Sequence, residues 1–118
     1  MPFHELLSNR FSMVLTGIVA LTLGPLSEEL AFRGFLMPLM VLRFGAVAGV
    51  VLTALPFALL HGPQYSWSWR HLLLLTLAGV AFGVVRHRTG STLAATMTHS
   101  TYNLTFFSAY LAQGRDWL

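Results

Sequence analysis

Long apolar runs, interrupted by a few charged residues, make up most of this chain. Stretches such as GVVLTALPFALL and HLLLLTLAGVAFGVV do not alternate between apolar and polar residues. Strands of membrane barrels alternate over about ten positions, whereas a helix in hydrocarbon satisfies its own backbone polar groups. The pattern therefore predicts helices. The apolar runs cover residues 11–27, 34–42, 44–60, 72–85 and 89–114.

These runs predict an all-α fold, a polytopic membrane helix bundle with about four transmembrane helices. A spanning helix needs about 20 mostly apolar residues, so several runs reach that length only by including the polar residues beside them. We expect the first helix to extend to about Arg43 and to be long or kinked near Pro25, because proline disturbs a helix interior. Further breaks are expected near Gly45, at residues 62–68 and at residues 87–90.

Composition supports the membrane assignment. Only 9% of the residues are Asp, Glu, Lys or Arg, against about 25% in an ordinary soluble domain. Apolar residues make up 55% of the chain, and its mean hydropathy is +0.67. The net charge of +3 comes from scattered arginines, which argues against a nucleic-acid-binding face. Cysteine is absent, which excludes thiolate nucleophiles and cysteine-ligated zinc.

Glycine spacing and length add two further expectations. Glycines four residues apart, at 45 and 49 and again at 79 and 83, let helix backbones approach closely. We expect packing within one bundle here, in preference to a dimer face. The whole chain, residues 1–118, is expected to be a single domain, because domains commonly take about 100–200 residues.

Six polar residues lie within or beside the apolar runs. Ionisable groups in hydrocarbon are destabilising by several kcal/mol, so they are rare there and are usually paired or functional. Their presence suggests chemistry inside a membrane. The six are Glu28, Glu29, Arg33, His61, His99 and Asn103.

The helix rise places these residues at a similar depth. At about 1.5 Å per residue, Glu28 lies roughly 22 Å from the Arg43 end of its helix, and His61 roughly 24 Å from the start of its own. His99 and Asn103 lie roughly 15–20 Å from the start of the last helix by the same rise. Convergence at one level is what a shared site requires.

The spacing within the first motif separates the roles of its two glutamates. Glu29 and Arg33 are four residues apart and can pair along a helix. Glu28 is then left to face the bundle interior, where burial and nearby charge can tune it as a general base. The alternative is structural: Ser27 caps a helix and the glutamates complement its dipole.

The second and third motifs also admit two interpretations. His61 ends an apolar run and is either an interfacial residue or a catalytic one. His99 and Asn103 share a helix face, four residues apart, and both can donate hydrogen bonds to an oxyanion. Hydrogen bonding between helices is the simpler alternative for this pair.

Taken together, the three motifs resemble a known family. They occur in a fixed order on an apolar helical chain, and the match covers most of it. The chain is similar to the CAAX protease and bacteriocin-processing family, also called the Abi family, which includes the eukaryotic prenyl-protein endopeptidase. Members usually carry further helices before the first motif. The motifs are EExxxR at Glu28, Glu29 and Arg33, FxxxH at Phe57 and His61, and HxxxN at His99 and Asn103.

The resemblance implies an intramembrane endopeptidase with a catalytic core of four transmembrane helices, no cofactor, and a peptide or protein substrate. It implies a location in the lipid bilayer, which we expect to be the bacterial cytoplasmic membrane. Roles follow by similarity. Glu28 and His61 would activate a water molecule, His99 and Asn103 would form the oxyanion hole, and Glu29 and Arg33 would support the site.

Three alternatives stay open. The same peptidase could act through zinc held by Glu28, His61 and His99, since Glu and His both bind zinc; the absence of an HExxH spacing disfavours this. The polar cluster could instead hold together a non-catalytic protein, such as a bacteriocin-immunity or scaffold component. A proton-coupled transporter is less favoured, because the paired repeats typical of one are not evident.

Overall fold

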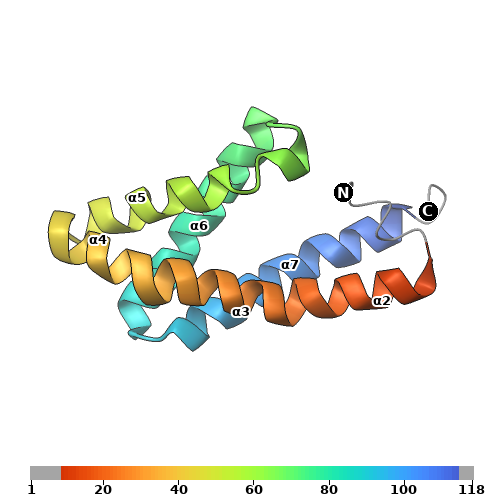
Figure 1. The fold of residues 1–118 in the computed structure, drawn as a ribbon, viewed down its shortest axis with the longest axis horizontal. Helices are drawn as coiled ribbons and strands as arrows, with labels where there is room; N and C mark the ends of the chain where they lie inside the picture. The colour runs from red at the N-terminus through yellow and green to blue at the C-terminus, as the bar shows by residue number, and fades with distance from the viewer. Residues whose placement is uncertain (1–8, 115–118) are drawn as a thin grey trace.

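The computed structural model describes residues 9–114, and this part of the chain is all-α with four long helical segments (Figure 1). The predicted fold class is confirmed. The first segment runs Arg10–Phe44 without interruption, and the others follow as α5, Ala46–Leu59, α6, Trp69–Thr89, and α7, Thr92–Gly114.

The first segment is long because two π-helical turns absorb its prolines. Gly24 donates its N–H to the carbonyl of Val19, and Met37 donates to that of Phe32, so each bond spans five residues. A proline follows each donor directly. The wider turn accommodates a residue that has no N–H and would clash with the preceding turn of an α-helix. The segment consists of α2, Arg10–Ile18, η1, Val19–Leu23, α3, Gly24–Glu29, η2, Leu30–Leu36, and α4, Met37–Phe44.

The remaining helices fold back as expected at glycine-containing breaks. Gly45 connects α4 to α5 with φ +89°, a conformation that glycine adopts without a steric penalty. The chain between α5 and α6 contains a short 3₁₀ turn, η3, Pro63–Tyr65. Gly90, with φ +66°, ends α6. In Figure 1, α7 runs beside α2 and α3, while the α4–α5 hairpin extends toward the opposite end of the molecule.

The glycines at 49, 79 and 83 lie at contacts between helices of the same chain. A Cβ atom at Gly49 would lie 2.6 Å from the backbone nitrogen of Val41 in α4. One at Gly83 would lie 2.9 Å from Val50 in α5. These helices can approach closely only because no side chain intervenes, so packing within the bundle accounts for these glycines.

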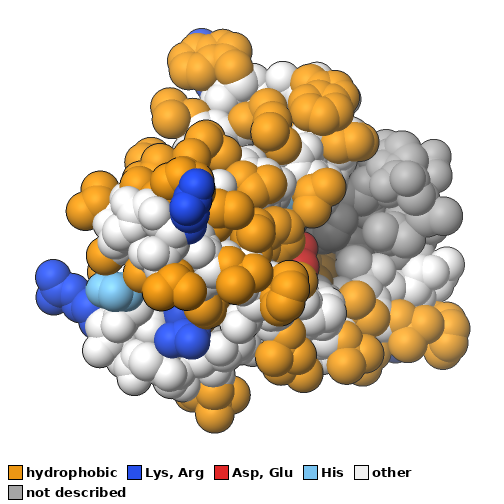
Figure 2. All heavy atoms as spheres, turned by 60° about the vertical axis from the view of Figure 1, so that its left-hand side comes forward, with side chains coloured by type: hydrophobic (Ala, Val, Ile, Leu, Met, Phe, Trp, Pro, Cys, Tyr) orange, Lys and Arg blue, Asp and Glu red, His pale blue; other side chains and the backbone are white. Residues whose placement is uncertain are grey.

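The distribution of side chains is that of a membrane protein. Large apolar residues cover the surface (Figure 2), including Leu42 at 86% and Val47 at 82% exposure. In contrast, Glu29 and Arg33 are completely buried. The Arg10–Phe44 segment and α6 are long and apolar enough to cross a membrane, and α5 is apolar but shorter. An apolar exterior around a charged interior fits a lipid environment.

Candidate active site

The three motifs meet around the carboxylate of Glu28. Glu28 lies in α3, His61 in the turn after α5, and His99 in α7. One oxygen of Glu28 is 3.1 Å from Nε2 of His61, and the other is 3.6 Å from Nε2 of His99. The expected convergence at one depth is thus present in the fold.

Behind this group lies a buried ion network centred on Glu29. Oε2 of Glu29 accepts a hydrogen bond from Nη1 of Arg33 at 3.1 Å and lies 2.8 Å from Nδ1 of His99. The predicted i, i+4 pair is therefore formed, with both side chains fully buried. Nη2 of Arg33 donates to the carbonyl oxygen of Gly79 in α6 at 2.6 Å. The network ties the first helix to both α6 and α7.

Aromatic rings enclose the charged groups. The guanidinium carbon of Arg33 lies 4.5 Å from the centre of the Phe57 ring, within the range of a cation–π interaction. The ring of Phe82 stacks on His99, with 4.6 Å between centroids. Phe57 also meets His61 and His99 at 4.9 and 5.6 Å between centroids. These rings lower the local dielectric, which strengthens the interactions between the charges.

The hydrogen bonds determine which nitrogens carry protons. Nδ1 of His61 lies 2.8 Å from the carbonyl oxygen of Phe57, and because a carbonyl only accepts, Nδ1 must be the donor. Nε2 therefore faces Glu28 and can exchange a proton with it. His61 lies in the turn beyond α5, outside the spanning helices, and its hydrogen bond to Glu28 raises the pKa of the imidazole.

The same argument applies to His99. Glu29 is paired with Arg33 and accepts from Nδ1 of His99, so the remaining nitrogen, Nε2, points to Glu28. A proton on Nε2 would make His99 an imidazolium between two carboxylates. Of the charged groups here, Glu29 and Arg33 are fully buried and balance each other, as buried ions require.

Asn103 lies one turn beyond His99 in α7 and is anchored to the first helix. Its Nδ2 donates to the carbonyl oxygen of Ala20 at 2.8 Å. Ala20 belongs to the π-helical turn η1. An amide nitrogen carries two hydrogens, so one N–H of Asn103 is used in this bond and the second is available to another acceptor.

Glu28 is the accessible carboxylate of the site. Its side chain is 32% exposed, whereas Glu29 is fully buried and His99 is 3% exposed. Figure 2 shows an acidic side chain reaching the surface beside apolar side chains. A ligand can therefore reach Glu28 but not the ion network behind it.

The residues do not form an evident metal centre. Among residues 9–114, no three His, Asp or Glu side chains are arranged to hold a metal ion. The imidazole nitrogens that face Glu28 are used in contacts with the carboxylate itself. A chelator experiment is the test of the zinc alternative.

Sequence reasoning did not find the partners on α6. Gly79 supplies the carbonyl that holds Arg33, and Phe82 supplies the ring that covers His99. A glycine carbonyl and a phenylalanine carry no chemical signature in a sequence. The only signal was the glycine spacing at 79 and 83, which indicates a close helix contact but not an arginine beside it.

Fold and site together define a class: polytopic helical membrane proteins with a glutamate–histidine centre enclosed by the bundle. The family described as Type II CAAX prenyl endopeptidase Rce1-like has a sequence model that matches residues 10–105. The chain belongs to this family of CAAX-type intramembrane proteases, which confirms the resemblance inferred from the motifs. No curated protein and no solved structure gave a significant match to the chain.

Proposed function

We propose that this protein hydrolyses a peptide bond within the membrane, with Glu28 and His61 activating the attacking water. One observation carries the proposal: a partly exposed carboxylate is held between two imidazole nitrogens, at 3.1 and 3.6 Å. Family membership supports a peptidase and a peptide or protein substrate. The proposal also places the protein in the bacterial cytoplasmic membrane.

The proton positions give the first step of the mechanism. Glu28 and Nε2 of His61 form a pair that can share one proton. When that proton is absent, both groups are hydrogen-bond acceptors. A water molecule that enters this site loses one proton to the pair as its oxygen attacks the scissile carbonyl carbon. The pair then delivers that proton to the leaving amine, as a general acid.

The oxyanion needs donors on the other side of the reacting carbon. Nε2 of His99, protonated in the imidazolium form, and the second N–H of Asn103 are assigned to this role. Removing one such donor commonly lowers kcat by about 10²–10³-fold. Glu29 keeps Nδ1 of His99 protonated, and Arg33 holds Glu29 in place. These two residues position the site without contacting the substrate.

The decisive experiment compares variants of the purified protein in detergent with a peptide library. Glu28→Gln keeps the shape of the side chain but cannot accept a proton, so cleavage should fall by about 10²–10⁴-fold. His61→Asn should behave similarly, whereas the matched control His71→Asn, at an exposed position, should cleave as the wild type does.

Three results would contradict the proposal. A folded Glu28→Gln variant that cleaves at the wild-type rate would remove the proposed base. Loss of wild-type activity on adding a chelator, restored by zinc, would favour the metal alternative. A protein that cleaves no peptide but still depends on Glu28 for its folding would support the non-catalytic alternative.

A further inference from the structure

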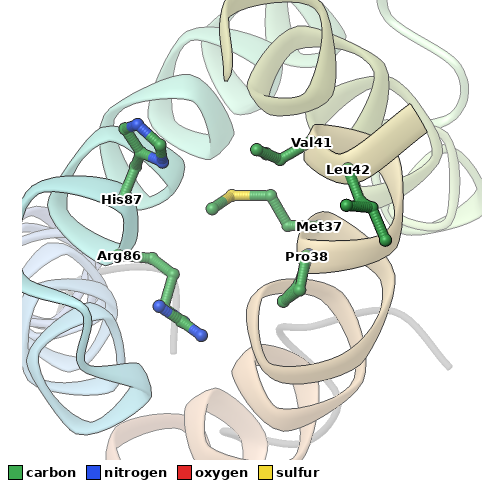
Figure 3. Close-up of a pocket in the computed structure, with 6 residues that line it drawn as sticks. All are labelled: Met37, Pro38, Val41, Leu42, Arg86 and His87. Carbon is green, nitrogen blue, oxygen red and sulfur yellow. The ribbon is translucent and has the colours of Figure 1, made fainter. Parts of the chain in front are cut away.

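A pocket with a volume of about 270 Å³ lies between α4 and α6, away from the candidate active site. Figure 3 shows its two sides: four apolar residues of the first helix face Arg86 and His87 of α6 across it. None of the six belongs to the glutamate–histidine centre. They are Met37, Pro38, Val41, Leu42, Arg86 and His87.

The Arg86 guanidinium is directed into this pocket while most of its donors are unused. Its Nε donates to the carbonyl oxygen of Arg33 at 3.1 Å, which fixes the side chain against the first helix. Among the described residues it makes no other hydrogen bond and has no carboxylate within ion-pair distance. The two Nη groups can therefore bind an acceptor, and the guanidinium fork matches phosphate geometry.

The surroundings of the pocket are basic, and its opposite wall is apolar. The last turns of α4 and α6 carry Arg43, Arg86, His87 and Arg88. In Figure 2, basic side chains gather at this end of the molecule next to apolar ones. No described carboxylate compensates this charge, because Glu28 and Glu29 are the only described acidic residues and lie in the active-site cluster.

We propose that this pocket binds an anionic phospholipid. The phosphate lies on Arg86 and His87, and an acyl chain lies along the apolar wall, where Leu42 is 86% exposed. Basic pockets between membrane helices are suited to anionic headgroups. A free phosphate would leave the apolar wall uncovered, and a zwitterionic lipid carries a positive group that the surrounding arginines repel. The proposal rests on the membrane location and not on the peptidase activity.

The test is native mass spectrometry of the full chain in detergent, titrated with phosphatidylglycerol and, separately, with phosphatidylcholine of the same acyl chains. Each basic residue near a lipid surface is expected to change affinity about fivefold. The wild type should bind phosphatidylglycerol at least about fivefold more tightly than phosphatidylcholine, and Arg86→Gln should abolish most of this preference. Arg70→Gln, at an exposed position at the other end of α6, should bind as the wild type does.

A second variant keeps the test valid if loss of the bond to the first helix unfolds Arg86→Gln. Leu42→Asp alters an exposed side chain and leaves that bond intact. It should remain helical by circular dichroism and bind phosphatidylglycerol about fivefold more weakly. The neutral variant Leu42→Ser should lose less of this affinity. The proposal would be overturned if the wild type bound both lipids equally, or if equimolar inorganic phosphate displaced the lipid. It would also be overturned if Leu42→Asp kept the wild-type affinity for phosphatidylglycerol, or if Arg70→Gln lost as much affinity as Arg86→Gln.

Discussion

The buried ion network makes a strong prediction about Arg33. This side chain is fully buried, pairs with Glu29 at 3.1 Å and donates to the Gly79 carbonyl at 2.6 Å. Arg33→Met retains a long apolar stem but leaves Glu29 buried without its main cation. We therefore expect the substitution to lower the free energy of unfolding substantially.

The magnitude separates an ion network from ordinary hydrogen bonding between helices. Breaking a buried ion pair by removing one partner is destabilising by about 3–5 kcal/mol. A hydrogen bond between membrane helices contributes only about 0.6 kcal/mol on average and at most about 1.7 kcal/mol. Since Arg33 also lies 4.5 Å from the Phe57 ring, its loss removes a cation–π contact as well. We therefore expect Arg33→Met to lower the free energy of unfolding by an amount near the upper end of the range for a broken buried ion pair.

The measurement is reversible unfolding of the purified protein in mixed detergent and dodecyl sulfate, followed by circular dichroism. Arg43→Met, an exposed arginine of the same helix, is the matched control and should change stability by less than about 0.5 kcal/mol. The double variant Glu29→Gln with Arg33→Met should be more stable than the single one, because no charge is left unpaired. A single-variant effect below about 1 kcal/mol, or strictly additive effects, would refute the network as the source of stability.

Three further predictions concern catalysis and packing. Asn103→Ala should lower kcat by about 10²–10³-fold with a smaller change in KM, and unchanged kcat would exclude an oxyanion role. Gly79→Ala would place a methyl carbon 2.9 Å from Nη2 of Arg33, so thermal unfolding should show a loss of about 1–3 kcal/mol. Because the bond to Glu28 raises the pKa of His61, and the proton-accepting form is the active one, activity should rise with pH through a transition above the usual histidine range. That transition should disappear in His61→Asn, and a wild-type rate that is independent of pH would contradict it.

Much of the fold could be predicted because the membrane restricts the available structures. Continuous apolar runs predict helices, and glycines at 45 and 90 mark two of the turns that the structure contains. The helix rise alone put Glu28, His61 and His99 at a similar depth. The sequence did not give the rotation of each helix about its axis. Whether the side chains of Glu28, His61 and His99 touch was therefore decided only by the structure.

The sequence pattern also did not predict the π-helical turns. Pro25 suggested a helix that is long or kinked; the chain widens one turn before each of two prolines and continues as one long helix. In one of these turns, the carbonyl of Ala20 accepts from Asn103, 83 residues away.

By itself, the sequence determined that the chain is helical, that it belongs in a membrane, and that Glu29 and Arg33 can pair, because composition and spacing along one helix decide these properties. Only the tertiary structure decided which nitrogen of each histidine faces Glu28, that the carbonyl of Gly79 accepts a hydrogen bond from Arg33, and that Arg86 faces an apolar pocket. These features depend on the rotation and close approach of separate helices. Side-chain packing sets both, and no periodicity along the chain encodes either.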